Sequence, residues 1–313
     1  MPTEPTPELL ALDWGTSSLR AFLMAAGAVL QTRQSTQGIQ HLPAPGAEGF
    51  EQALEQIGGD WLRRWPGLPV MAGGMVGSAQ GWREAAYAEC PADLGRLAAG
   101  AVRLRCRLGS EVTIAPGVLY APAAAPPDVM RGEEVQIAGA LLGQPGWAAR
   151  SRIVLPGTHS KWVEVREGRI ERFATFMTGE MFALLRRHSI LGRSMAPDAA
   201  PDTAAFERGL EAARRSRPGE FLHQIFEVRS LGLVGRLTPA AQPEYLSGLL
   251  IGHELAAGLG ATDEAAPLLL IGDPALCRRY AVALRWFDSG ECTLLDNTAP
   301  AGLWALAQAA RVG

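Results

Sequence analysis

The stretch Leu9-Leu10-Ala11-Leu12-Asp13-Trp14-Gly15-Thr16-Ser17-Ser18-Leu19-Arg20 decides the fold of this chain. An apolar run ends in the carboxylate of Asp13, a turn rich in glycine and hydroxyl groups follows, and a second apolar run begins at Leu19. A further turn at Ala26-Gly27 leads into a third run over residues 29–32. Strand, polar turn, strand, turn and strand in this order predict a small antiparallel meander.

The same pattern returns in the second half of the chain, where Gly157-Thr158 stands 142 residues after Gly15-Thr16. Residues 152–155, 162–165 and 170–176 are the strands expected around this second turn. A repeat separated by nearly half the chain predicts two similar lobes. We place their boundary at the Gln144-Pro145-Gly146 break, which gives an N-terminal lobe of residues 1–145 and a C-terminal lobe of residues 146–313.

Helices and further strands are predicted between and after the two repeats. Residues 69–72 form a short strand that leads into the glycine-rich loop 73–78, and residues 268–271 form a buried strand before Gly272-Asp273. Together with the helices, these strands indicate the α/β class. Apolar spacing predicts helices over 49–64, 133–142, 179–190, 204–215, 245–259, 275–284 and 302–311.

The composition excludes several classes of protein. With 48% hydrophobic and 19% charged residues, the 313-residue chain is too apolar for a disordered protein. A net charge of -3 offers no basic surface to a nucleic acid. The N-terminus resembles no signal peptide and no apolar run approaches about 18 residues, so we expect no membrane partner. Four cysteines without a C-x-x-C pair indicate reduced thiols and a cytoplasmic location. The oligomeric state stays open, with a homo-oligomer as one possibility.

The first turn has the donors that a phosphate needs. Glycine allows the backbone to approach closely, and successive backbone N–H groups and hydroxyls can donate to phosphate oxygens. Asp13 is placed to hold Mg²⁺, directly or through water, and Arg20 could reach a phosphate. The alternative is an ordinary hairpin turn with a capping aspartate. The candidate nucleotide-binding residues here are Asp13, Gly15, Thr16, Ser17, Ser18 and Arg20.

The second turn repeats these donors over Gly157, Thr158, His159, Ser160 and Lys161. Lys161 is the only lysine among 29 basic Lys and Arg residues. One explanation is genome base composition, which replaces lysine by arginine wherever function allows. The other is that position 161 requires a compact ammonium group that can follow a moving phosphoryl group. His159 either donates to a phosphate or is simply hydrogen-bonded in place. We expect the two turns to grip one polyphosphate from opposite sides.

The three donor-rich turns, the last at Gly272-Asp273, resemble the nucleotide motifs of the superfamily of acetate kinases, sugar kinases, heat-shock chaperones and actin. More closely, the chain resembles the 2-dehydro-3-deoxygalactonokinase family over nearly its whole length. Two departures are visible: Gly73-Gly74 holds one glycine more than is usual, and Asp273 stands where small uncharged residues are usual. The matching stretches are residues 12–16, 70–82, 129–136, 155–163, 177–180, 226–229 and 246–252.

The resemblance implies two ribonuclease H-like lobes with mixed sheets flanked by helices and an active site in the cleft between them. It implies ATP and Mg²⁺ as cofactors, with Gly272 and Asp273 at the adenosine. The implied reaction is phosphorylation of 2-dehydro-3-deoxy-D-galactonate to its 6-phosphate in galactonate breakdown. By analogy with related sugar kinases, the base is a carboxylate at the start of the helix before the second turn, where Glu134 is our first choice and Glu133 its neighbour.

The implied substrate is an anion, so its carboxylate needs a cation or backbone donors. Arg131 is the first choice for this cation and Arg83 the second. Thr178, Gly179 and Glu180 begin a helix and would close over the sugar or the phosphates. The remaining substrate-binding candidates, on the glycine-rich loop, are Gly74, Met75, Gly77, Ser78 and Trp82.

Other functions stay open at this stage. The same nucleotide site would serve a kinase of another sugar acid, or of an amino or anhydro sugar, with a changed loop over residues 73–83. A non-catalytic ATP-binding switch would need neither Glu133 nor Glu134, whose charges would then only favour the N-terminus of their helix. An exopolyphosphatase-like hydrolase would use water in place of the sugar. We expect Trp14 and Trp162 to be core residues.

Overall fold

The computed structural model describes residues 5–198, 200–260 and 266–312 and divides into two compact units. Among these residues, unit 1 holds the chain up to Ser151, Glu164–Phe173 and the segment from Asn297 onwards. Unit 2 holds Arg152–Val163 and Ala174–Asp296. The closing segment therefore belongs to unit 1, while the lobe boundary inferred at residues 145–146 stays a prediction.

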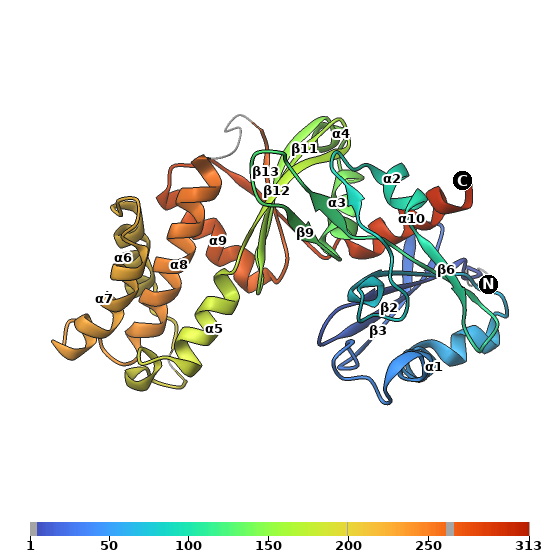
Figure 1. Ribbon diagram of the computed structural model, residues 1–313, viewed down its shortest axis with the longest axis horizontal. Coiled ribbons are helices and arrows are strands. Elements are labelled where there is room, and N and C mark those ends of the chain that lie inside the picture. The colour runs from blue at the N-terminus through green and yellow to red at the C-terminus, as the bar shows by residue number, and fades with distance from the viewer. Residues whose placement is uncertain (1–4, 199, 261–265, 313) are drawn as a thin grey trace. The chain divides into compact units, whose positions relative to one another are not determined.

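Unit 1 is built on a six-stranded mixed sheet (Figure 1). The first three strands pair antiparallel in the order β3-β2-β1, which confirms the predicted meander. β1 then pairs parallel with β4, and β4 with β7, whereas β6 closes the edge antiparallel. The strands are β1 (Leu9–Trp14), β2 (Leu19–Ala25), β3 (Ala28–Ser35), β4 (Val70–Gly74), β6 (Val102–Arg105) and β7 (Glu111–Ile114).

The register of this sheet brings two predicted features to one edge. Asp13 on β1 lies opposite Arg20 on β2 and Gly73 on β4, and the next β1 residue lies opposite Gly74. Because β1 and β4 are parallel, both end at the same edge of the sheet. The first donor-rich turn and the glycine-rich loop therefore begin side by side.

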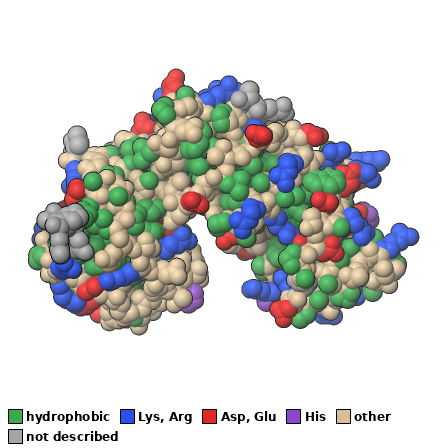
Figure 2. Space-filling view, turned by 180° about the vertical axis from the view of Figure 1, so that it is seen from behind, with side chains coloured by type: hydrophobic (Ala, Val, Ile, Leu, Met, Phe, Trp, Pro, Cys, Tyr) green, Lys and Arg blue, Asp and Glu red, His purple; other side chains and the backbone are tan. Residues whose placement is uncertain are grey.

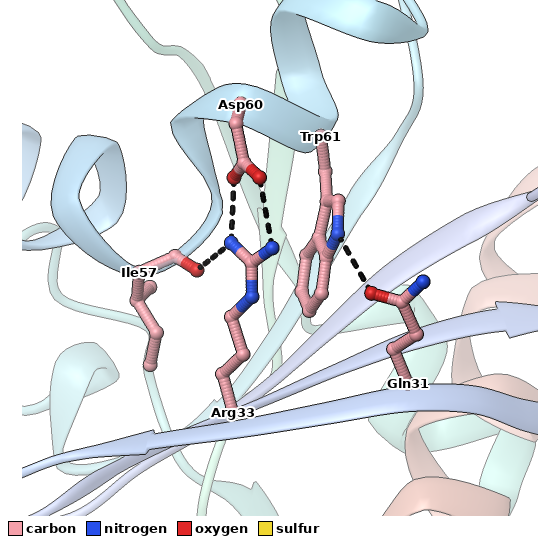
Figure 3. Close-up of polar contacts among 5 residues, drawn as sticks. All are labelled: Gln31, Arg33, Ile57, Asp60 and Trp61. Atoms are coloured by element: carbon pink, nitrogen blue, oxygen red, sulfur yellow. Dashed lines mark hydrogen bonds and ion pairs between the residues drawn. The ribbon is translucent and has the colours of Figure 1, made fainter.

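Helix α1 (Gly46–Arg64) covers this sheet with the apolar stripe that its sequence predicts. Its outer face is fastened to β3 by Arg33, which donates to Ile57 O at 3.0 Å and to both oxygens of Asp60 (Figure 3). The guanidinium also lies 3.8 Å above the Trp61 ring, whose Nε1 donates to Gln31. This hydrogen bonding lowers the pKa of Asp60 to about 2.

The rest of unit 1 carries the helix with the two candidate acids. A small sheet of β5 (Ala88–Glu89), β8 (Val118–Tyr120) and β9 (Asp128–Met130) leads into α3 (Glu133–Leu141). The closing helix α10 (Ala299–Val312) packs tightly on α3, because a Cβ added at Gly302 would lie 1.9 Å from the Val135 carbonyl oxygen. α2 (Leu94–Ala99) and the 3₁₀ turn η1 (Met75–Gly77) complete the unit.

The second sheet repeats the strand order of the first, β12-β11-β10 followed by β13 and β14, with the last two pairings parallel. This order confirms the predicted repeat and an α/β fold with mixed sheets flanked by helices. The elements are β10 (Arg150–Leu155), β11 (Ser160–Arg166), β12 (Arg169–Phe176), β13 (Leu268–Ile271), β14 (Cys292–Leu295), α5 (Thr178–His188), η2 (Gly192–Ser194), α6 (Thr203–Arg214), α7 (Phe221–Leu233), α8 (Ala241–Gly260) and α9 (Pro274–Trp286).

The break at Gln144-Pro145-Gly146 follows the end of α3, and Pro145 begins the short helix α4 (Pro145–Ala149) just before β10. Proline suits a first helical position, because its φ is already helical and its missing N–H would have no partner there. On the face shown in Figure 2, basic and acidic side chains are interspersed, in keeping with a net charge of -3. No helix in the described part of the chain is long and apolar enough to cross a membrane.

Candidate active site

Backbone hydrogen bonds fix the first turn, and its side chains are exposed to solvent. Gly15 N donates to Ser18 O at 2.9 Å, while Thr16, Ser17 and Ser18 are exposed. Behind the turn, the backbone of residues 39 and 40 donates to its carbonyls at 3.1 Å. A Cβ at Gly38 would lie 2.4 Å from Ser18 N, so only glycine fits there. The backbone of the turn is thus fixed, while the side chains of Thr16, Ser17 and Ser18 are accessible to a ligand.

Asp13 and Arg20 flank this turn from neighbouring strands. The Arg20 guanidinium lies 3.9 Å from the Asp13 carboxylate. Burial raises the pKa of Asp13, and the positive charge of Arg20 opposes that rise. Between Asp13 and the turn, Trp14 is fully buried and packs against Phe50 and Trp82, as expected of a core residue.

The glycine-rich loop and the start of α3 meet beside the end of β1. Gly74 has a φ of 93°, and a Cβ there would lie 2.7 Å from the Trp14 carbonyl oxygen. Gly132 has a φ of 110° and approaches the Cα of Gly74. Both positions require glycine, because other residues rarely adopt such φ values. Gly74 and Gly132 therefore allow the start of α3 to lie close to the end of β1.

Three predicted site residues share one property, a buried polar atom without a hydrogen-bond partner among the described residues. These atoms are Ser78 Oγ, Arg131 Nε and Nη1, and Glu134 Oε1. Buried polar atoms are nearly always hydrogen-bonded in folded proteins, so such a group marks a place where a polar ligand supplies the missing partners.

Glu134 and Glu133 have different environments although they are adjacent. Glu134 is fully buried, and its Oε2 accepts from Gly132 N at 2.6 Å. Burial, with a smaller contribution from Glu133, raises the pKa of Glu134 to about 8. Glu133 is partly exposed and accepts from Arg131 N at 3.1 Å. Glu134 thus combines a raised pKa with a carboxylate oxygen that has no partner among the described residues.

Arg131 is fixed in place by groups that the sequence analysis missed. Its Nη2 donates to Ala85 O at 2.9 Å, and its guanidinium lies 4.5 Å from the centre of the Tyr87 ring. Gly77 leaves room for it, because a Cβ there would lie 3.0 Å from Arg131 Nη1. The second-choice cation, Arg83, is exposed instead. Met75 lies in η1, and Trp82 stacks on Phe50.

In unit 2 the second turn is joined to the start of α5. Glu180 N donates to Thr158 O at 3.0 Å, and a Cβ at Gly179 would lie 2.3 Å from Gly157 O. His159 Nε2 lies 2.5 Å from a Glu180 carboxylate oxygen, so its imidazole is hydrogen-bonded in place. Thr178 begins the same helix, as predicted, and its closing over the sugar or the phosphates stays a prediction.

Lys161 and the late turn complete this region. Lys161 is 5% exposed and donates to Thr175 Oγ1 at 2.7 Å, on the sheet face opposite that of Ser160. A Cβ at Gly272 would lie 3.2 Å from Pro156 O, so the late turn adjoins the second one. The Asp273 carboxylate caps α9 by accepting from Ala275 N and Leu276 N at 2.9 Å.

A cavity of about 310 Å³ opens beside the second turn. Both apolar and polar side chains from α5, α8 and α9 line it. This mixture suits a small ligand with a flat apolar part and a few polar edges. The cavity is lined by Gly157, Thr178, Gly179, Phe182, Arg186, Glu244, Ser247, Leu250, Ile251, Leu276, Arg279 and Tyr280.

A family model described as 2-keto-3-deoxy-galactonokinase matches residues 13–306, and so spans both sets of turns. The chain belongs to this family. A 2-dehydro-3-deoxygalactonokinase of Escherichia coli is 34% identical over 97% of this chain and 99% of its own. A Rhizobium meliloti protein named as a probable 2-dehydro-3-deoxygalactonokinase is 37% identical over 88% of each chain.

The fold of this member of the 2-keto-3-deoxy-galactonokinase family is also similar to that of a solved relative. The crystal structure of a Sinorhizobium meliloti protein, named as a candidate 2-dehydro-3-deoxygalactonokinase, superposes with a TM-score of 0.85 at 35% identity. The match covers 96% of this chain and 98% of that one.

The described residues of this family member include no group of three or more acidic, histidine or cysteine side chains that could hold a metal by themselves. Mg²⁺ in phosphoryl-transfer sites is usually held by one or two carboxylates, phosphates and water. Asp13, alone at the end of β1 and beside the exposed hydroxyls of Thr16 and Ser17, fits that mode of binding.

Proposed function

We propose that this chain transfers the γ-phosphoryl group of ATP to 2-dehydro-3-deoxy-D-galactonate and forms the 6-phosphate. The family supports a sugar-acid kinase. The observation that carries the choice of acceptor site is the cluster of unpartnered polar atoms of Ser78, Arg131 and Glu134 beside the first turn. It combines a cation, a hydroxyl and a carboxyl group, which are the partners that an anionic, hydroxylated substrate requires.

In this proposal Arg131 binds the carboxylate of the sugar acid, with Arg83 as the second choice, and Ser78 contacts a hydroxyl together with the loop that holds Gly74, Met75, Gly77 and Trp82. The unpaired donors of Arg131 are held by Ala85 and Tyr87, so they lose little freedom when the substrate binds.

Glu134 is the proposed base. The terminal hydroxyl oxygen attacks the γ-phosphorus, the bond from that phosphorus to the bridging oxygen breaks, and ADP leaves with its electron pair. The hydroxyl proton passes to Glu134 late in the transfer. Its raised pKa of about 8 makes it an effective proton acceptor once ionised.

The nucleotide is proposed to bind along the donor-rich turns. The hydroxyls and amides of residues 15–18 and the turn at residues 157–161 donate to phosphate oxygens, Arg20 adds a positive charge, and the cavity beside Gly157 receives the nucleoside next to Gly272-Asp273. Thr178–Glu180 would close over the phosphates or the sugar. Mg²⁺, held by Asp13 and the phosphates, neutralises charge on the transferred group. Four free cysteines favour a cytoplasmic enzyme, and a homo-oligomer is compatible with it.

The test is to incubate the protein with ATP and Mg²⁺ and a panel of 2-keto-3-deoxy sugar acids, and to measure ADP and phosphorylated product. We expect turnover that requires the galactonate derivative. Turnover with another acceptor would identify the related kinase instead, and equal ATP hydrolysis without any sugar would identify the hydrolase. Nucleotide-dependent conformational change without turnover would identify the switch.

Two variants test the base. Glu134→Gln should keep both substrates bound but lower kcat by at least about a hundredfold, the usual scale for loss of a general base. In the wild type, kcat/KM should rise with pH up to about 8 and then level off, because the base acts in its ionised form. Glu133→Gln is the matched control, and a reversed pair of effects would exchange the two roles.

A further inference from the structure

A second buried polar cluster lies in unit 2, directly behind the second turn. The carboxylate of Glu254 on α8, only 2% exposed, accepts hydrogen bonds from Trp162 Nε1 at 2.8 Å and from Tyr280 Oη at 2.6 Å. Tyr280 Oη lies 3.0 Å from Ser160 Oγ, and the Thr178 hydroxyl hydrogen-bonds into the same cluster. Groups from β11, α5, α8 and α9 therefore meet at one carboxylate.

The two hydrogen bonds to Glu254 have a defined direction. The four hydrogen-bonding side chains around Glu254 favour its ionised form, although burial raises its pKa. The Tyr280 hydroxyl and the Trp162 N–H both donate to Glu254, whose carboxylate oxygens accept. The Ser160 hydrogen is then directed toward Tyr280 or Glu254. Ser160 Oγ is left as an acceptor, and Gly157 N points toward it at 3.4 Å.

We infer that Glu254 is a positioning residue that fixes the second turn through Tyr280 and Ser160. The chain of hydrogen bonds begins at the buried carboxylate and ends at the backbone of Gly157, and both Gly157 and Tyr280 line the 310 Å³ cavity. This inference rests on the proposed function, in which the cavity and the turn bind ATP. It gives Ser160 a supporting role in which its hydroxyl hydrogen is not available to a phosphate.

The cluster is suited to positioning the second turn because its hydrogen bonds are shielded from solvent. Ser160 is 0% exposed and Tyr280 is 1% exposed, so water cannot replace a missing link at low cost. Breaking one link would leave a buried carboxylate oxygen and a buried hydroxyl with fewer partners. The effect should fall on nucleotide binding, because the sugar-acid candidates Ser78, Arg131 and Glu134 lie in unit 1.

Tyr280→Phe is the direct test, because it removes the linking hydroxyl and keeps the ring. Tyr245→Phe is the matched control in the same unit, since Tyr245 Oη donates to the Glu227 carboxylate at 2.9 Å away from the cavity. The loss of one hydrogen bond to a charged group should raise the KM and Kd for ATP at least about fivefold. We expect the KM for the sugar acid to change less than twofold, and Tyr245→Phe to change neither constant.

Ser160→Ala breaks the same chain one link nearer the turn and serves if Tyr280→Phe folds poorly. The double variant Tyr280→Phe/Ser160→Ala should bind ATP no more weakly than the single variant with the lower ATP affinity, because either change interrupts the same chain of hydrogen bonds. Equal ATP constants for Tyr280→Phe and Tyr245→Phe, or additive losses in the double variant, would overturn the inference. A wild type that neither binds nor consumes ATP would instead overturn the proposed function, so the two failures are distinguishable.

Discussion

Replacing Glu134 by glutamine should stabilise the protein at neutral and alkaline pH while it removes activity. The side chain is fully buried and its pKa is raised from 4.5 to about 8, chiefly by burial. Between these values the folded protein keeps a proton that the unfolded chain has lost, so the free energy of unfolding falls as pH rises. The stabilising contribution is complete below pH 4.5 and is lost on passing through pH 8. Glutamine is neutral throughout and avoids this cost.

The size of the effect follows from the two pKa values. Between pH 4.5 and pH 7 the free energy of unfolding of the wild type falls by about 1.4 kcal/mol per pH unit, because the unfolded chain has lost the proton that the folded protein keeps. Over these 2.5 units the loss is about 3 kcal/mol. Above pH 8 the loss levels off at about 5 kcal/mol. The amide can still accept from Gly132 N, so the neutral wild type and the variant should be equally stable near pH 4.5.

Urea unfolding of the wild type and Glu134→Gln between pH 4.5 and 9 measures this difference directly. We expect the two proteins to have the same free energy of unfolding at low pH. As pH rises, the free energy of unfolding of Glu134→Gln should become the larger of the two. Glu133→Gln should depart from the wild type by less than Glu134→Gln does, because it removes only the smaller, Glu133 contribution to the raised pKa of Glu134. Parallel curves for wild type and Glu134→Gln would refute the reasoning, since they would mean that Glu134 ionises in the folded protein as easily as in the unfolded chain.

Three further substitutions test separate parts of the site. Arg131→Lys should raise the KM for the sugar acid at least about tenfold and leave that for ATP unchanged, because a lysine cannot donate as a fork; equal shifts in both constants would contradict this. Gly38→Ala should lower the thermal midpoint and weaken ATP binding, because the added Cβ would lie 2.4 Å from Ser18 N in the first turn. Gly146→Ala is the control: its Cβ would meet nothing within 4 Å, so it should change neither property. Lys161→Arg should lower kcat if the buried ammonium follows the phosphoryl group; an unchanged kcat would leave base composition as the explanation.

The parts of the fold that the sequence predicts are those set by local pattern. The three strands of each repeat, the glycine-rich loop and helix α3 lie where periodicity and turn residues place them. Helix α7 was missed, and its exposed Leu222 and Phe226 show why, because apolar residues on the solvent side blur a helical pattern. The small sheet β5-β8-β9 was missed because each strand has only two or three residues.

The parts of the site that the sequence does not predict depend on distant partners. Gly38 supports a turn about 20 residues earlier, Tyr87 holds Arg131, and Tyr280 reaches Ser160 across 120 residues. No local pattern announces such contacts. The motif around Glu134 is recognisable in the sequence, but its burial is not, because no local pattern shows which distant groups pack around the start of α3.

Burial alone does not distinguish a catalytic acid from a structural one in this protein. Three glutamates are buried among the described residues, and they differ in how their oxygens are satisfied. Glu164 is paired with Arg172 at 2.6 Å, and Glu254 is surrounded by hydrogen-bonding side chains. Glu134 alone of the three keeps an oxygen without a partner in the described part of the chain. An oxygen without a partner can accept a substrate proton without first losing a hydrogen bond to the protein, and we therefore propose proton transfer for Glu134 and positioning for Glu254.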